Sequence, residues 1–249
     1  NLGYSALNTA RSALSSFIEI DNCPVGKHKL VQRFMRSVYL KKPSLPKTSI
    51  TWDVEVVLDY LKTLSPVRSL SLKDLTLKLT MLLLLLSGSR GQTILALNVK
   101  NMSLSYSRAK FVLGDLLKTS RPGHHLGELK FKAYAPDRRL CVLTVLKEYL
   151  KRTLDVRGTT SQLLLTFKAP HKAASRDTIR RWTREILTRA GIDMTMFTPH
   201  STRAASTSCA AMKLSLDTIL KTACWSQKST FQRYYHKKIV KEFGDAILN

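Results

Sequence analysis

The sequence predicts a mainly α fold with one small antiparallel β-sheet, that is, an α+β protein. Most segments carry apolar residues three and four positions apart, which is the spacing of an amphipathic helix. Two short stretches, 110–117 and 128–132, instead have strand character and flank a turn at Arg121-Pro122-Gly123. With 249 residues and 44% hydrophobic content, the chain is long enough to bury a sizeable core in one large domain or two unequal ones.

The first 47 residues are expected to form a helical domain of their own. The pattern is helical from Tyr4 to about Leu40, with a second, basic helix expected over residues 29–39. Residues 41–47 then contain two prolines and three lysines. Because proline lacks a backbone donor and fixes φ, this stretch predicts an extended linker. The domain boundary is therefore placed here, which gives domains at 1–47 and 48–249.

The rest of the chain is expected to be mostly helical. Ser71 is a candidate N-cap for an apolar helix that Gly88 ends, and Arg90 follows directly. Residues 162–167 fit either a strand or a loop. A strongly basic helix is expected over 175–190, and the glycine that follows ends it. The other expected helices cover residues 52–64, 72–86, 136–153, 201–212, 215–223 and 229–235.

The charge of the chain points to a polyanionic partner. Forty-one Lys and Arg residues against 17 Asp and Glu give a formal net charge of +24. Nucleic acid is the commonest such partner, because each neutralised phosphate releases a condensed counterion. A ribosome-like binder, a nucleic-acid enzyme and a protein of anionic membranes would all show this balance. The apolar run 81–86 is far shorter than the roughly 20 residues needed to cross a bilayer, so no membrane span is expected.

The cysteines do not indicate a metal site. The four of them show neither a CxxC spacing nor a paired-histidine pattern, which argues against zinc. Their scatter is typical of buried thiols in a reducing compartment. The chain begins with Asn1-Leu2-Gly3 and not with methionine, so we expect a fragment of a longer protein.

Two segments carry the candidate chemistry, 198–203 and 224–235. His200 and Arg203 lie three positions apart at an expected helix start and therefore on one face. The positive end of the helix dipole beside an arginine makes an anion site. A later helix places Tyr234 about one turn from its start. A phosphate-binding pair and a tyrosine can thus converge, although spacing alone does not establish it.

The order and spacing of these groups resemble the signature of the tyrosine recombinase (phage integrase) superfamily. In this sequence His200-x-x-Arg203 is followed after 22 residues by Trp225, and Tyr234 comes nine residues later. The segment Trp-Ser-x-x-Ser-Thr-x-x-x-Tyr is similar to the family's motif around the nucleophile, which often carries His at the Trp position.

Upstream segments extend the resemblance over essentially the whole chain. Arg90, in Ser-Gly-Ser-Arg-Gly after a hydrophobic helix, is similar to the family's first arginine, and Lys118 resembles the lysine of the sheet's hairpin. Residues 1–47 match the end of the family's helical core-binding domain. The stretches 4–17 and 87–93 further resemble the recombinases of DIRS-type retrotransposons. The alternatives to Lys118 are Lys110, Lys130 and Lys132.

The resemblance implies site-specific cleavage and rejoining of DNA strands. The tyrosine would attack phosphorus and leave a 3′-phosphotyrosine with a free 5′-hydroxyl, so no ATP, metal or other cofactor is implied. Two arginines would clamp the phosphate oxygens, the histidine would assist proton transfer and the lysine would protonate the leaving oxygen. The tryptophan would donate its indole N–H to a phosphate oxygen. The implied catalytic residues are Arg90, Lys118, His200, Arg203, Trp225 and Tyr234.

The chain departs from the family's pattern in two places. Many members carry an acidic residue three positions after the first arginine, where this chain has Thr93. Tyr235 directly follows Tyr234, so the choice between them rests on the nine-residue spacing. Taken singly, each candidate residue also fits an ordinary core or solvated surface. Two alternatives are a DNA-binding protein that kept the fold without turnover and an enzyme like the type IB topoisomerases.

The resemblance also implies partners and a location. Double-stranded DNA is the expected substrate, bound by a homotetramer with a dimer at each site, in the integration or excision of a mobile element. The likeness to eukaryotic retroelements implies a nuclear location. The apolar tail after Tyr235 fits docking on a neighbour and docking on its own core equally well. Four arginines of the basic helix are candidate DNA contacts, with a solvated face as the alternative: Arg176, Arg180, Arg181 and Arg184.

Overall fold

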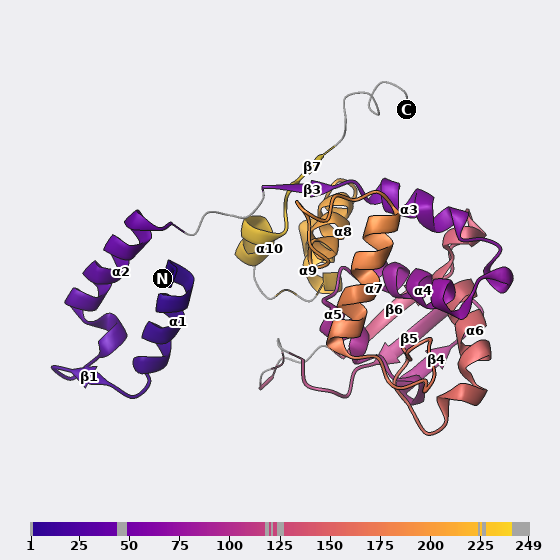
Figure 1. Ribbon diagram of the computed structural model, residues 1–249, viewed down its shortest axis with the longest axis horizontal. Helices are drawn as coiled ribbons and strands as arrows, with labels where there is room; N and C mark the ends of the chain where they lie inside the picture. The colour runs from indigo at the N-terminus through magenta and orange to yellow at the C-terminus, as the bar shows by residue number, and fades with distance from the viewer. Residues whose placement is uncertain are drawn as a thin grey trace. The chain divides into compact units, whose positions relative to one another are not determined.

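The computed structural model of the protein describes residues 2–43, 49–117, 120, 122–123, 127–223, 225 and 228–240. The chain divides into two compact units, Asn1–Ser49 and Ile50–Asn249. Both units are drawn in Figure 1. The fold is mostly helical with small sheets, which confirms the predicted fold class.

The first unit is a helical hairpin closed by a short β-ribbon. Its ribbon turns at Asp21 and Asn22, both with positive φ, and a buried glycine, Gly26, packs against Ser15. The amide of Gly26 donates to the Ser15 hydroxyl at 2.9 Å. A Cβ at Gly26 would lie 2.6 Å from that oxygen, so a larger residue there would force the Ser15 hydroxyl to move. The elements are α1 (Tyr4–Leu14), β1 (Glu19–Ile20), β2 (Cys23–Pro24) and α2 (Lys29–Lys41).

The second unit is built around one apolar helix, α4 (Leu72–Ser87). Twelve of its residues are buried, because several other helices and the sheet pack against it. The Ser71 hydroxyl accepts from the amide of Asp74 at 3.0 Å and begins the helix, and Gly88 ends it with φ of 56°. The packed neighbours are α6 (Val142–Thr153), α7 (Arg176–Arg189) and α8 (Ser201–Ala211), while α3 (Val54–Thr63) packs on α7 and α8.

A three-stranded antiparallel sheet lies below α4 and beside α6 in Figure 1. It consists of β4 (Met102–Leu104), β5 (Arg108–Val112) and β6 (Glu128–Lys132). Alternate residues of β5 and β6 face the core, as the sequence predicts for a half-exposed sheet. The first expected strand begins two residues earlier and ends at Val112, and β4 was not predicted. Residues 162–167 form a loop with two isolated bridges.

The end of the second unit folds back onto its beginning. On the side of α4 away from α6, α8 packs against α4, α9 (Leu216–Ala223) packs against α8, and α10 (Lys228–Tyr234) packs against α9 (Figure 1). The strand β7 (Lys238–Val240) then pairs in parallel with β3 (Ile50–Trp52). Sequence periodicity did not predict this pairing, because each strand has only three residues. None of the helices in the described ranges is long and apolar enough to span a membrane.

Candidate active site

The start of α8 is held in place by hydrogen bonds around Ser201. Its hydroxyl donates to the carbonyl of Thr198 at 2.6 Å and accepts from the indole N–H of Trp52 at 2.9 Å. His200 is the N-cap residue, and Arg203 lies one turn into the helix. The two side chains predicted to form an anion site are therefore carried by one anchored helix start.

Arg203 is a buried arginine packed against aromatic rings. Only 3% of its surface is exposed, and its Nη2 donates to the carbonyl of Ala223 at 2.5 Å. The guanidinium carbon lies 4.2 Å from the ring centre of Trp225 and 5.1 Å from that of Tyr235. Arginine suits this position because its planar, delocalised cation stacks on rings and keeps donors for an anion.

A tyrosine completes this cluster, and it is Tyr235. Its hydroxyl oxygen lies 3.3 Å from Nε2 of His200, within hydrogen-bond distance. Its ring centre is 4.7 Å from that of Trp225. The structure therefore brings together a histidine, an arginine, a tryptophan and a tyrosine from α8 and the α9–β7 segment.

Tyr234, the nucleophile predicted from spacing, is not brought to this cluster. Its side chain is 56% exposed at the end of α10, whereas Tyr235 contacts His200 and Arg203. Consecutive helical residues point about 100° apart, so the two side chains leave the end of α10 in different directions. Phe231 is buried, and Tyr235 lies four residues after it, on the same face. The four-residue spacing from Phe231 to Tyr235 is the sequence feature that could have indicated Tyr235 as the tyrosine facing the cluster.

Arg90 lies at the turn that joins α4 to α5 (Gly91–Leu95), where it is half-buried at the N-cap position. This turn is pressed against the cluster's helices: a Cβ at Gly88 would lie 2.9 Å from Cγ2 of Thr207 in α8 and 3.6 Å from Cβ of Ala223 in α9. Ala223 is also the residue whose carbonyl binds Arg203. Thr93, which replaces the family's acidic residue, is buried in α5.

Trp225 presents an indole N–H to the interior of the cluster. The residue is 8% exposed, and its Nε1 has no hydrogen-bond partner within the part of the chain that the structure describes. A buried N–H without an acceptor costs free energy, so such groups usually serve a ligand or a structural role. This N–H is a candidate donor to a bound oxyanion.

The predicted lysine, Lys118, lies outside the described residues. Two of its alternatives are ion-paired: Lys110 Nζ lies 2.7 Å from Glu128, and Lys130 pairs with the same carboxylate. Hydrogen bonds from these two lysines lower the pKa of Glu128 to about 2. The third alternative, Lys132, is exposed at the end of β6.

A protein-family model matches most of the chain and identifies its family. The model of the phage integrase family matches residues 53–239, from before α3 to within β7. The chain belongs to the phage integrase family. No protein among the curated ones matches it.

Several solved structures of tyrosine recombinases share the fold. The XerH site-specific recombinase bound to difH has a TM-score of 0.57 at 14% identity, over 94% of this chain and 67% of that one. The XerA recombinase gives 0.56 at 15% identity, over 99% and 81%. The Tn1549 transposon integrase in complex with circular intermediate DNA gives 0.58 at 14% identity, over 100% and 79%.

This phage integrase family member carries a row of exposed arginines on α7. The four predicted residues all face solvent, while the opposite face of the helix is buried against α4 and α5. None of the four forms an ion pair with another described residue, whereas Arg189 at the end of α7 pairs with Asp74 and Glu185. The four remain candidates for DNA contact.

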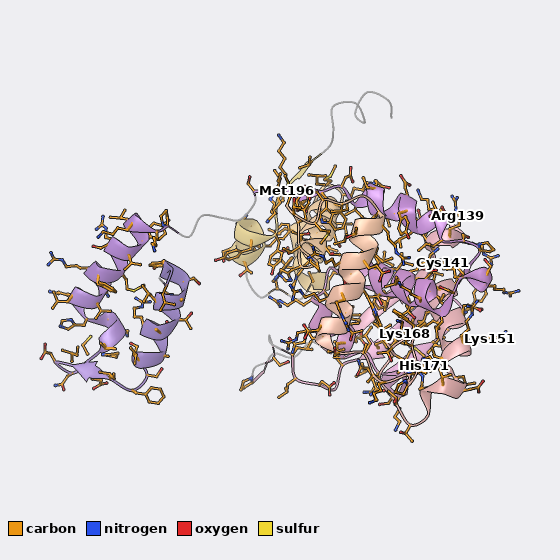
Figure 2. All side chains as sticks on the ribbon, viewed as in Figure 1. Arg139, Cys141, Lys151, Lys168, His171 and Met196 are labelled. Carbon is orange, nitrogen blue, oxygen red and sulfur yellow. The ribbon has the colours of Figure 1, made fainter. Side chains whose placement is uncertain are left out.

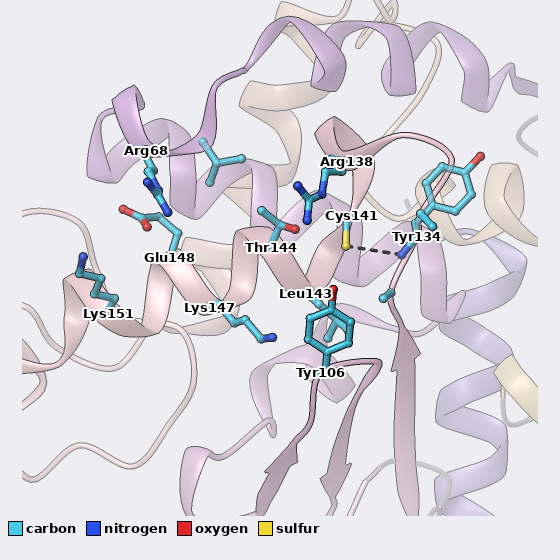
Figure 3. A pocket seen from close by; sticks show the side chains of 13 residues that line it. Arg68, Tyr106, Tyr134, Arg138, Cys141, Leu143, Thr144, Lys147, Glu148 and Lys151 are labelled. Carbon is cyan, nitrogen blue, oxygen red and sulfur yellow. Dashed lines mark hydrogen bonds between the residues drawn. The ribbon is translucent and has the colours of Figure 1, made fainter.

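The pocket of about 460 Å³ beside α6 shares no residue with the cluster. Figure 3 shows it between Tyr106, the N-terminal half of α6 and Arg68, with the amide of Tyr134 donating to the sulfur of Cys141. Burial works to raise the pKa of Cys141, but hydrogen bonds from Thr144 and nearby amides outweigh it and lower the pKa. In Figure 2, Cys141 lies far from Met196, which precedes α8.

The described residues hold no group of three or more His, Cys, Asp or Glu side chains arranged to bind a metal ion. The contacts among His200, Arg203, Trp225 and Tyr235 make this cluster, with the neighbouring Arg90 turn, the candidate active site of this family member. Its groups are a proton acceptor, cations, an N–H donor and a phenol, which are suited to chemistry on a phosphate.

Proposed function

We propose that this protein cleaves and rejoins DNA strands at specific sites through a 3′-phosphotyrosine intermediate, with Tyr235 as the nucleophile. The observation that carries the proposal is the contact of Tyr235 with both His200 and Arg203, at 3.3 Å and 5.1 Å. A phenol beside a proton acceptor and a buried guanidinium has the parts that attack on a phosphodiester requires.

The reaction begins with proton transfer from the tyrosine. An ordinary tyrosine has a pKa near ~10, so it is a weak nucleophile at neutral pH until a base accepts its proton. His200 Nε2 is within reach of that proton in the tautomer protonated on Nδ1. The tyrosine oxygen then bonds to phosphorus, and the bond from phosphorus to the 5′-oxygen breaks. That oxygen takes up a proton, for which Lys118 is the predicted donor, and a later 5′-hydroxyl reverses the sequence.

Preformed hydrogen-bond donors stabilise the negative charge that develops on the phosphate oxygens. Arg203 is held by the Ala223 carbonyl and the two aromatic rings, so it is not reorganised during the reaction. Arg90 and the N–H of Trp225 supply further donors. Removal of one such preorganised donor typically lowers a rate by about 10²–10³.

The partner is proposed to be double-stranded DNA, in the setting of a mobile element. The net charge of +24 and the arginines of α7 support a polyanionic duplex. DNA-bound complexes of this fold are known for XerH and for the Tn1549 transposon integrase, and a lambda integrase tetramer is bound to a Holliday junction. From these we extend a homotetramer on DNA to this chain. The DIRS-type relationship and the nuclear location belong to the same proposal and are supported by the sequence resemblance of residues 4–17 and 87–93 alone.

Covalent trapping tests the proposal. Nicked suicide duplexes that carry candidate element ends are incubated with wild type, Tyr235→Phe and Tyr234→Phe, and the products are separated on denaturing gels. We expect a protein–DNA adduct that Tyr235→Phe abolishes and Tyr234→Phe retains. An adduct lost only with Tyr234→Phe keeps the reaction class and makes the nine-residue spacing the correct guide to the nucleophile.

Two other outcomes favour the alternatives. If no variant gives an adduct while all bind DNA with the same salt dependence, the chain is a DNA-binding protein with the recombinase fold. If the wild type relaxes supercoiled plasmid without any specific site, a type IB topoisomerase-like activity replaces recombination.

A further inference from the structure

The buried hydroxyl of Ser208 forms hydrogen bonds with the backbone on both sides of His236, the residue that follows the candidate nucleophile Tyr235. Ser208, in α8, is only 3% exposed. Its Oγ donates to the carbonyl oxygen of Tyr235 at 2.7 Å and accepts from the amide of Lys237 at 3.0 Å. A serine hydroxyl has one proton and two lone pairs, so these two bonds use its donor and one acceptor site.

These bonds hold a stretch of chain that has just left a helix. The amides of Tyr235 and His236 both donate to the carbonyl of Phe231 at 2.8 Å, which ends α10. Three residues after Tyr235 the chain enters β7, which pairs with β3. Between α10 and β7, therefore, Ser208 fastens the backbone to α8.

The same helix holds the reactive groups that face the tyrosine side chain. His200 is the N-cap residue of α8, and Arg203 lies in the first turn of the helix. Ser208 lies eight residues after His200, roughly 12 Å along the helix axis. Tyr235 therefore contacts α8 in two places. Its backbone carbonyl accepts a hydrogen bond from Ser208, and its side-chain hydroxyl lies within hydrogen-bond distance of His200.

We propose that Ser208 is a positioning residue for the nucleophilic tyrosine. By fixing the backbone of Tyr235 to α8, it sets the distance from the tyrosine oxygen to the phosphate held by Arg203. A displacement of about 1 Å at the reacting atoms can cost roughly 10² in rate. This inference rests on the proposed function, because it takes Tyr235 as the nucleophile.

The substitution Ser208→Ala isolates this role. Alanine occupies nearly the same space and is a better helix former than serine, so α8 itself loses nothing. What is lost is the pair of hydrogen bonds to Tyr235 and Lys237. The matched control is Ser206→Ala, because the Ser206 hydroxyl also bonds from α8 to a backbone carbonyl, that of Leu85 in α4. Ser208→Thr keeps the hydroxyl.

The first measurement is single-turnover adduct formation by the full chain on a suicide duplex, as a function of DNA concentration. For Ser208→Ala we expect the maximal rate to fall about tenfold or more, with a half-saturating DNA concentration within twofold of wild type. Ser206→Ala is expected to stay within threefold of wild type, and Ser208→Thr to recover most of the rate. Equal maximal rates for Ser208→Ala and Ser206→Ala overturn the inference, even if Tyr235 forms the adduct.

The second measurement does not depend on activity. Amide hydrogen exchange over residues 236–240 is followed in the free protein. We expect faster exchange there in Ser208→Ala, and wild-type exchange in Ser206→Ala. If the wild type forms no adduct, the proposed function fails, and this exchange measurement still decides whether Ser208 holds the segment. Unchanged exchange in Ser208→Ala overturns the positioning role.

Discussion

Nε2 of His200 and the hydroxyl oxygen of Tyr235 lie 3.3 Å apart, although 35 residues separate them in the chain. The helices α8, α9 and α10 bring them together, with Trp225 packed against the tyrosine ring at 4.7 Å. The pair unites a proton acceptor with a phenol, and Arg203 lies over the same ring.

Substitution of His200 tests the proton acceptor. We expect His200→Ala to lower the single-turnover rate of adduct formation by about 10²–10⁴, the usual range for a general base. DNA affinity is expected to change little, because the proposed role of His200 is in proton transfer and not in binding. The control is His171→Ala, whose ring contacts the Thr166 carbonyl in a loop outside the cluster. A rate for His200→Ala within threefold of wild type rules out this role.

Salt dependence of DNA binding tests the arginines of α7. Each phosphate contact contributes about 0.9 to the slope of log affinity against log salt. Replacing the four arginines with glutamine is expected to flatten the slope by up to about 3.6. The variants are Arg176→Gln, Arg180→Gln, Arg181→Gln and Arg184→Gln.

The matched control removes the same number of charges from the pocket beside α6, which shares no residue with the cluster. It combines Arg68→Gln, Arg138→Gln, Lys147→Gln and Lys151→Gln. If both sets flatten the slope equally, α7 is not a specific DNA surface and its arginines act only through net charge.

Gly88 tests the packing of the α4–α5 turn against α8. Its φ of +56° disfavours a side chain, and an added Cβ would lie 2.9 Å from Cγ2 of Thr207. We expect Gly88→Ala to lower the free energy of unfolding by roughly 1–3 kcal/mol. Gly191→Ala is the control, since Gly191 also has positive φ, +85°, but nothing within 4 Å of the added Cβ.

The comparison separates backbone strain from the clash. The free energy of unfolding is measured by urea denaturation, and Gly88→Ala is expected to be the less stable of the two. Adding Thr207→Ser, which removes Cγ2, is expected to restore part of the loss. Equal stability of both alanine variants means that the α4–α5 turn shifts to accommodate the Cβ without disturbing α8.

Lys78 makes stability depend on pH in the alkaline range. It is fully buried in α4, and its Nζ donates to the Leu64 carbonyl at 2.6 Å. Burial lowers the pKa of Lys78 from 10.5 to about 8. Between these values the unfolded chain binds more protons than the folded one, so the free energy of unfolding is expected to rise with pH.

The measurement is urea denaturation at several pH values from 7 to 10.5, with Lys78→Met as the comparison. The rise for one group cannot exceed about 1.4 kcal/mol per pH unit. Lys78→Met is expected to remove this rise. Lys73→Met, which replaces a half-buried lysine of the same helix that is ion-paired with Glu185, is expected to keep it. A wild-type curve that is flat across this interval contradicts a lowered pKa for Lys78.

The helices of the second unit were predictable because their burial patterns are local. Residues 72–86 were expected to form an apolar helix, and α4 covers Leu72–Ser87 with Ser71 as its cap. The cap is read from the serine and from Asp74, three residues later. Likewise, alternating side chains located β6 at 128–132.

The choice of tyrosine depended on tertiary structure. Spacing after Trp225 indicated Tyr234, which remains a prediction until trapping is done. Packing places Tyr235 against Arg203, because Phe231 orients α10 and the residue four positions later shares its face. The parallel pairing of β3 with β7 also escaped prediction, since three-residue strands from opposite ends of the unit have no local signal.

By itself, the sequence determined the fold class, the family signature and the basic character of the protein, since all three depend on residue type and short-range periodicity. Only the tertiary structure decided which tyrosine meets His200, that Arg203 is buried between rings, and that Ser208 holds the backbone after Tyr235. The physical reason is that these contacts join residues 20 to 35 positions apart. Their geometry comes from helix packing, which no local pattern encodes.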